Sequence, residues 1–328
     1  MRRALPAALV LLVLLVLLAL PIGAGSLYSD FYLSLAIRVF AFVILLLGFD
    51  LLAGYGGLIS FGHAMFFGTG AYAAALTLKH LTPSVWAALA VAVVVSAALA
   101  LVVGFLSIRA REIYFVFLTF AFAQFAYHAV NSWEWAGAAN GLPGIPPPSL
   151  WIAGRLPVDL DRRAVFYYFA LALAGAAFLV ARRIVGSAFG RVLVGIRENE
   201  ERARFLGYDV TRCLRRAFLI SGVFAGVGGA VLASFHGFVA PTFYHWSVSG
   251  EVLLMALLGG MGTLVGPMAG AAFVIVLGDI LSSWLAERWL LVMGLIYVAC
   301  VLFSPTGFAG IARRLGALRD AAPAERAP

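Results

Sequence analysis

Long runs of apolar residues separated by short polar stretches dominate the chain. Residues 5–22 contain no polar side chain, and residues 84–106 interrupt their apolar background only with Ser84, Ser96 and a glycine. An α-helix needs about 20 apolar residues to cross the hydrocarbon of a membrane, whereas a barrel strand shows roughly ten residues of alternating polarity. The pattern therefore predicts membrane-spanning helices.

The apolar runs predict an all-α, polytopic membrane protein of about ten transmembrane helices, some of them short or discontinuous. The expected spans are residues 5–22, 31–53, 58–78, 84–106, 112–131, 164–181, 217–236, 250–265, 267–283 and 289–303. Only the glycine-rich residues 259–267 separate the eighth run from the ninth, so these are either two short helices or one re-entrant hairpin.

Three regions follow from these runs. Residues 1–30 are expected to hold a first transmembrane helix and an external turn, residues 31–304 the main transmembrane domain, and residues 305–328 a cytoplasmic tail. The first run also fits a cleavable signal peptide, because Arg2 and Arg3 precede it and small residues follow it. A retained helix is the favoured interpretation, since the run is long enough to span.

Composition supports a membrane protein and excludes several classes of enzyme. Hydrophobic residues make up 63% of the chain and charged residues 12%, against roughly 45–50% and about 25% in soluble domains. Lys79 follows a leucine and is the lysine of no phosphate-binding loop, so ATP hydrolysis would need a partner chain. Cys213 and Cys300 have no metal-site or disulfide spacing. We expect neither enzymatic activity nor a cofactor or metal.

The net charge of +8 reports orientation in the membrane and not a nucleic-acid partner. Nine arginines lie between residues 181 and 216, and basic loops stay on the cytoplasmic side. This places the loop 182–216 and both termini in the cytoplasm. Residues 132–163 then form the largest external loop.

The loop 182–216 contains a pattern typical of a rigid helix. One helical stripe is formed by Val192, Ile196, Asn199, Ala203 and Leu206. Three pairs of opposite charge are spaced four residues apart: Arg197 with Glu201, Glu198 with Arg202, and Glu200 with Arg204. Gly207 is expected to end the helix, and Asp209 or Thr211 to cap the next one. Such a helix favours a docking element over a solvated linker.

Polar residues within the predicted spans are candidates for a translocation path. Ser60 and His63 would share one helical face if residues 54–72 are helical, and they would either line a path or bond neighbouring helices. A membrane hydrolase is a weak alternative, because no G-x-S-x-G or H-E-x-x-H motif is present. Asp50 is interpreted as marking a span end, and the small residues of 222–229 as allowing close helix packing.

Four blocks in order resemble the permease subunits of branched-chain amino-acid ABC importers, of the LivM type. They are GYGGLISFGHAMFFGTGAYAAA (54–75), SIRAREIYFVFLTFAFAQ (107–124) followed by NGLPGIPPP (140–148), GRVLVGIRENEERARFLGYDVTR (190–212) and SGEVLLMALLGGMGTLVGPMAGA (249–271). The resemblance covers about residues 31–304 and implies the ABC importer permease fold in a bacterial or archaeal cytoplasmic membrane.

The resemblance implies that the third block couples the permease to an ATPase. The family pattern of Glu-Ala-Ala, three residues and Gly falls on Glu201, Arg202, Ala203 and Gly207, and Arg202 departs from it. The expected coupling residues are Gly190, Arg197, Glu198, Asn199, Glu201, Ala203 and Gly207. The candidate path residues are Tyr55, Ser60, His63, Gln124 and Thr263. Asp50 stands where the family commonly carries Asn, and Phe61 where Leu is usual.

The implied partners are a second homologous permease, two ATPase subunits and an external substrate-binding protein, in a lipid bilayer. The chain would form half of a translocation pathway for branched-chain or related amino acids, and relatives also handle amides or urea. The alternative is a stand-alone secondary transporter or channel for a small polar solute.

Overall fold

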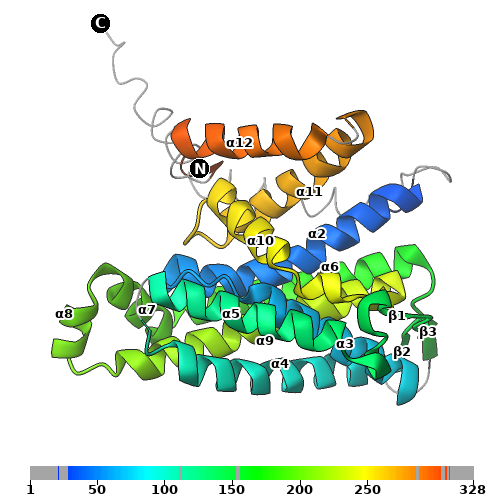
Figure 1. Ribbon diagram of the computed structural model, residues 1–328, viewed down its shortest axis with the longest axis horizontal. Coiled ribbons are helices and arrows are strands. Elements are labelled where there is room, and N and C mark those ends of the chain that lie inside the picture. The colour runs from blue at the N-terminus through cyan, green and yellow to red at the C-terminus, as the bar shows by residue number, and fades with distance from the viewer. Residues whose placement is uncertain are drawn as a thin grey trace, which may run out of the picture.

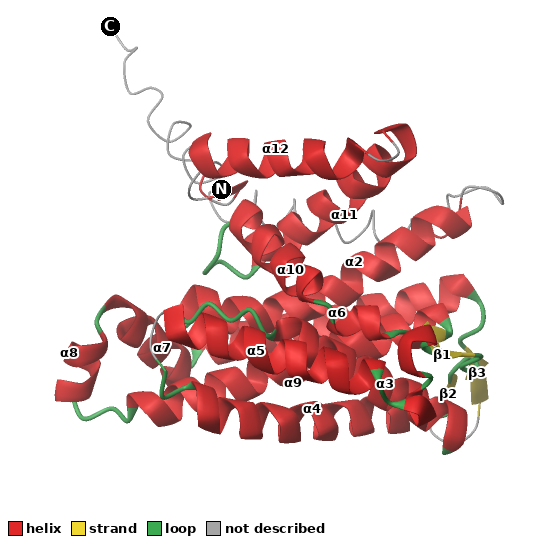
Figure 2. Ribbon diagram, in the orientation of Figure 1, coloured by secondary structure: helices red, strands yellow, loops and turns green. Residues whose placement is uncertain are grey.

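The computed structural model describes residue 21 and residues 29–110, 113–152, 156–285, 288–303, 307–308 and 310. Helices account for almost all of the regular structure, and the few strands gather at one end of the molecule (Figure 2). The predicted first helix at 5–22 lies almost wholly outside the described residues, as does most of the predicted tail.

Each predicted span from residue 31 onward coincides with a helix. The helices are α2 (Ser29–Asp50), the π-helix η1 (Leu51–Tyr55), α3 (His63–His80), α4 (Val85–Ser107), α5 (Ile113–Asn131), α6 (Arg163–Gly186), α7 (Ala188–Glu198), α8 (Glu200–Phe205), α9 (Val210–His236), α10 (Trp246–Gly259), α11 (Val265–Leu285) and α12 (Trp289–Phe303). Single 3₁₀ turns are η2 (Glu134–Ala136), η3 (Ala138–Asn140) and η4 (Pro241–Tyr244).

The helices form a long bundle with a second layer on one side (Figure 1). Helix α9 lies within the bundle and packs against α2, α3 and α4, while α10, α11 and α12 form the second layer. The short helices α7 and α8 project from one end, which we call the α8 end (Figure 1). The strands mark the opposite end, which we call the strand end.

Short strands tie the strand end together. Strand β1 (Leu142–Pro143) pairs antiparallel with β4 (Phe238–Val239), so Leu142 lies opposite Val239. Strands β2 (Ser149–Ile152) and β3 (Leu156–Asp159) form a second antiparallel pair. The predicted loop 132–163 therefore contains the three strands β1, β2 and β3 in addition to η2 and η3.

Small residues let α3 and α9 approach closely, as the sequence predicted for 222–229. A Cβ atom on Gly70 would lie 1.9 Å from the carbonyl oxygen of Gly226, and one on Gly229 would lie 1.8 Å from that of Phe67. Both obstacles are backbone atoms, which cannot swing away as the end of a side chain can. The α3–α9 contact is thus backbone against backbone.

The described residues confirm six of the about ten spanning helices expected, and the full number stays a prediction. Six helices there are long and apolar enough to cross a membrane: α2 continued by η1, α4, α5, α6, α9 and α11. Helix α10 has 14 residues, which reach only about 21 Å at 1.5 Å per residue, against a hydrocarbon core of about 30 Å. Residues 246–285 thus form two separate helices, of which the first is too short to span.

The segment just before α10 lies inside the bundle. Phe243 stacks on Phe67 with ring centroids 5.8 Å apart, and the buried Tyr244 lies against Gly68. Phe67 and Gly68 belong to the first two turns of α3, which starts on the α8 side. The chain after β4 consequently returns into the bundle before α10 starts.

Replacing Gly70 by alanine should lower stability because the new methyl group overlaps the backbone of α9. Overpacking of this kind costs about 1–3 kcal/mol, so we expect a clear fall in the thermal midpoint of the detergent-purified chain. Gly175→Ala is the matched control, since no atom lies within 4 Å of its added Cβ. Equal midpoints for the two variants would contradict the close α3–α9 packing.

Candidate functional site

Helices α7 and α8 form a bent pair, and the single continuous helix predicted for this region is wrong. Asn199 adopts φ −161° and ψ 103°, and its Oδ1 accepts a hydrogen bond of 2.8 Å from the backbone N–H of Arg202. An Asn side chain competes in this way for backbone N–H groups and favours a cap over a helix interior. Asn199 therefore ends α7 and starts α8.

The bend changes the predicted charge pairs. Glu200 and Arg204 lie within α8 and form an ion pair of 2.6 Å. The two other predicted pairs, Arg197 with Glu201 and Glu198 with Arg202, cross the bend and form no ion pair in the described part of the chain. Beyond α8, Gly207 has φ +87°, and Asp209 caps α9 through the N–H of Arg212, both as predicted.

The predicted apolar stripe divides into a buried and an exposed part. Ile196 and Ala203 are buried, as is Leu193, and they hold the pair against the bundle. Leu206 was expected in the same stripe but is 71% exposed, and its neighbour Phe205 is 90% exposed. Together with Tyr208, which is 48% exposed, they form an apolar tip on α8 that sequence reasoning missed. Glu198, Asn199 and Glu201 are exposed beside it.

Arg197 ties the helix pair to the bundle. Its Nη1 donates a hydrogen bond to the carbonyl oxygen of Gly54, within the π-helix η1. Gly57, in the left-handed region at φ +76°, lies directly against the Arg197 side chain, where an added Cβ would be 2.8 Å from Cγ. A π-turn leaves carbonyl groups out of regular helical bonding and is frequent at functional sites. Arg197 is exposed on α7, and among the predicted coupling residues it is described with a side-chain hydrogen bond to the backbone of the bundle.

Asp50 joins the same region to the glycine-rich turn between α10 and α11. This fully buried carboxylate accepts backbone hydrogen bonds from Gly262 at 2.6 Å and from Leu264 at 3.0 Å. Leu264 has φ +59°, a left-handed conformation that costs a non-glycine residue about 1–2 kcal/mol. Asp50 thus holds the turn in a conformation that it would not adopt alone. Its interpretation as a simple span end missed this role.

We call Asp50, η1, Arg197 and residues 260–264 the junction. Within it, Thr263 closes the turn, since its hydroxyl donates to the carbonyl of Gly260 at 2.9 Å and accepts from the N–H of Gly266 at 3.0 Å. Tyr55 is the last residue of η1 and is partly buried. Two of the candidate path residues therefore belong to the elements of the junction.

The remaining candidate path residues, Ser60, His63 and Gln124, lie outside the junction. Ser60 precedes α3 in an irregular segment, where its hydroxyl accepts from the N–H of Gly62 at 3.2 Å, so Ser60 and His63 do not share a helical face. His63 is fully buried and its Nε2 lies 2.7 Å from the hydroxyl of Ser221 on α9. Gln124, on α5, has a buried Oε1 without a hydrogen-bond partner in the described structure.

Residues around the start of α10 form a polar surface that the sequence did not indicate. The ring of His245 lies 5.5 Å from that of Tyr127 on α5, and its Nδ1 is 2.8 Å from the hydroxyl of Ser247. Trp246 and Ser247, the first residues of α10, are exposed, although Tyr244 just before them is buried. A helix start inside a transporter is a recurring site for polar solutes, but no periodicity in the sequence marks it.

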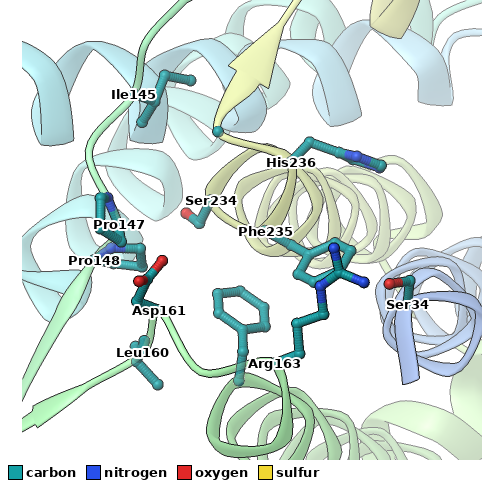
Figure 3. Close-up of a pocket in the computed structure, with 12 residues that line it drawn as sticks. Ser34, Ile145, Pro147, Pro148, Leu160, Asp161, Arg163, Ser234, Phe235 and His236 are labelled. Carbon is teal, nitrogen blue, oxygen red and sulfur yellow. The ribbon is translucent and has the colours of Figure 1, made fainter. Parts of the chain in front are cut away.

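Two cavities open at the ends of the bundle. At the strand end, a cavity of about 450 Å³ lies between the end of α9, the start of α6 and α2 (Figure 3). Asp161 and Ser34 lie on opposite sides of it with the Arg163 side chain between them (Figure 3), and Arg163 also lies 3.5 Å from Asp30. At the α8 end, a cavity of about 500 Å³ is lined by the segments after η1 and after α4 and by the helices α7 and α8, with Gly57, Arg109 and Arg197 among its residues.

These features define a polytopic helical membrane protein in which a protruding helix pair is bonded to the interior of the bundle. Residues 31–301 match the family of permease components of branched-chain amino acid transport systems, and the chain belongs to this family. The resemblance seen in the sequence is thereby confirmed.

Individual relatives are also named as permease proteins of branched-chain amino acid transport systems. The chain is 29% identical to the high-affinity branched-chain amino acid transport system permease protein LivM of Salmonella typhimurium strain LT2, and equally to LivM of Escherichia coli strain K12. Both alignments cover 92% of this chain and 75% of the relative. A shorter match, 26% identical over 38% of this chain and 40% of the relative, is to the permease protein LivH of the same system in Escherichia coli strain K12.

Replacing Asp50 by alanine should destabilise the junction, because two backbone N–H groups lose their acceptor. Each unpaired buried group costs about 1–3 kcal/mol, so we expect a lower thermal midpoint and faster hydrogen exchange at residues 260–264. Asp50→Asn should be intermediate, since its amide offers one acceptor oxygen in place of two.

The control is Asp30→Ala, which removes a half-exposed ion pair of 3.5 Å. Such pairs contribute about 0–1 kcal/mol, and hydrogen exchange of residues 260–264 should stay unchanged. Exchange in Asp50→Ala that matches the wild-type rate would contradict the assigned role of Asp50.

Proposed function

We propose that this chain is the permease subunit of an ATP-driven ABC importer for branched-chain or related amino acids. It would form half of the translocation pathway, within residues 31–304, and couple to a separate ATPase. One observation carries the proposal: the protruding pair α7 and α8 is bonded through Arg197 to the interior of a bundle that belongs to a transport permease family.

The proposed ATPase contact is the exposed surface of α8. Phe205, Leu206 and Tyr208 offer apolar area, and Glu201 offers a charge beside it. Exposed aromatic residues with a polar rim are typical of protein interfaces. The buried side of the pair, with Leu193, Ile196 and Ala203, keeps the two helices attached to the bundle when the partner moves.

The junction then transmits the movement. A displacement of α7 carries the guanidinium of Arg197 with it, and Arg197 is bonded to η1. The π-helix continues α2, whose Asp50 holds the turn between α10 and α11. A partner that binds one arrangement more tightly than another shifts the population between outward-facing and inward-facing states.

We assign the α8 end to the cytoplasm and the strand end to the outside. The arginine-rich residues 182–216 support this orientation, which also puts both termini in the cytoplasm of a bacterial or archaeal cell. The ordered strands and the cavity at the strand end offer a surface for an external substrate-binding protein. A second permease subunit would complete the pathway.

For the pathway itself we propose a line of polar groups that runs from the start of α10 to the junction. Gln124 and the exposed Ser247 lie at the start of this line. Tyr55 and Thr263 lie at its cytoplasmic end. Ser60 and His63, both buried, would support its wall from behind.

The double variant Glu201→Lys/Phe205→Ser should abolish ATPase docking without affecting membrane insertion. In an importer assembled with its ATPases, second permease and binding protein, we expect capture of the ATPase and ATP-driven leucine uptake to fall about tenfold or more, as for loss of an interface hot spot. Glu134→Lys/Trp133→Ser is the control for ATPase capture, because it makes the same kinds of change at the strand end, away from the proposed ATPase contact.

Retention of ATPase capture by Glu201→Lys/Phe205→Ser would contradict the docking surface. Leucine uptake by the chain alone, driven by an ion gradient in vesicles without ATPase, would instead support the stand-alone transporter.

Arg197→Gln should uncouple ATP hydrolysis from uptake, because its shorter neutral side chain does not span from α7 to Gly54. We expect ATPase capture to persist while leucine transported per ATP hydrolysed falls several-fold. Arg191→Gln is the control, since Arg191 is exposed on the same helix and bonds only Gly186 beside that helix, at 3.2 Å. Equal transport ratios in both variants would remove Arg197 from the coupling route.

A further inference from the structure

Two arginines at the α8 end share one aromatic ring. The guanidinium carbon of Arg109 lies 5.0 Å from the ring centroid of Phe105, and that of Arg215 lies 4.8 Å from the same centroid. Phe105 belongs to the last turns of α4, and Arg215 to the first turns of α9. The two helices meet at this level, since a Cβ on Gly104 would lie 2.9 Å from the ring of Phe218.

These two positive charges have no acidic partner in the described part of the chain. Glu198 and Glu200 line the cavity at the α8 end together with Arg109, but the ion pairs described there join Arg204 to Glu200 and Arg212 to Asp209. The Nε of Arg215 is shielded from solvent and bonds no acceptor there. A buried N–H without an acceptor is costly, and two cations on one ring repel each other. An external anion bound to the exposed guanidinium atoms would reduce this repulsion.

The surface around the ring faces lipid. Phe105 is 52% exposed, and the same helix exposes Leu101, Val102 and Leu106 by 58%, 60% and 49%. Helix α9 has 27 residues and is about 40 Å long at 1.5 Å per residue, longer than the hydrocarbon core of about 30 Å. Its first turns can therefore lie at the depth of the lipid headgroups.

We propose that Arg109, Arg215 and Phe105 bind the headgroup of an anionic phospholipid. The guanidinium groups donate hydrogen bonds to phosphate oxygens, a pairing for which their planar fork is suited. The acyl chains lie along the exposed apolar face of α4. A zwitterionic headgroup brings its own cation to the two arginines, so an anionic lipid is preferred. Basic sites between membrane helices are typical of such recognition.

The site adjoins the helix pair but uses other residues than the proposed ATPase contact, since Arg109 lines the cavity at the α8 end together with Glu198, Glu200 and Arg204. The helix α8 projects away from the bundle (Figure 1), whereas Phe105 belongs to the exposed apolar face of α4. The inference rests only on the chain spanning a membrane, and not on the assignment of α8 as the coupling element.

The test measures lipid binding by the purified full-length chain with native mass spectrometry and thermal shift, using phosphatidylglycerol, phosphatidylcholine and inorganic phosphate as probes. Wild type should retain phosphatidylglycerol in preference to phosphatidylcholine and gain thermal stability from it. Arg109→Gln/Arg215→Gln should reduce this preference about tenfold, given two interfacial arginines. Phe105→Leu, which keeps the charges and an apolar surface, should reduce it less.

Arg182→Gln/Arg183→Gln is the matched control, since both arginines are exposed in the last turns of α6 at the same end. It removes the same charge and should keep the preference. An equal loss in the control would reduce the effect to general electrostatics, and a full shift with inorganic phosphate would indicate a free-anion site. Either result overturns the proposal, as does unchanged lipid preference in Arg109→Gln/Arg215→Gln. Should the double variant fail to fold, Arg109→Gln alone, at an exposed position, decides the same question.

Discussion

The carboxylate of Asp50 is the constraint on which the α8 end of the bundle depends. A fully buried charge is tolerated only where hydrogen bonds replace its lost hydration, and two backbone N–H groups of one turn do so here. This anchors the turn between α10 and α11 to the end of α2. With Arg197 bonded to η1 immediately beyond Asp50, three parts of the chain far apart in sequence meet within one short segment.

The core of the bundle is rigid, and the junction can move relative to it. Glycines bring the backbones of α3 and α9 into contact, so the two helices have little room to slide or separate. The elements attached to this core are packed less tightly. Helices α7 and α8 contact the bundle through a few buried side chains, and α10 is a short helix. The architecture thus combines a fixed body with attachments that are bonded to one another at a single place.

The positions of the helices were largely predictable from the sequence, because a span needs a long apolar run and such runs are unmistakable. Close helix packing at 222–229 was also predictable, since small residues spaced four apart in an apolar run favour it, whereas the partner helix α3 was not. By contrast, Asn199 was assigned to a helical stripe because its spacing fits, although its side chain caps α8 instead. The partners of Asp50 lie 212 and 214 residues away, and no local pattern indicates such a pairing. The lengths of α10 and of the loop before it depend likewise on tertiary packing.

The central claim is that the α8 tip and the turn at 260–264 move together through the junction. Pulsed electron paramagnetic resonance tests it in the assembled importer, with Cys213 and Cys300 replaced by serine and spin labels at Leu206→Cys, Met261→Cys and, as a reference on α4, Val94→Cys. On ATP binding, the distance between positions 206 and 261 should stay constant while both change relative to position 94. A change between 206 and 261 as large as either change relative to 94 would contradict the account.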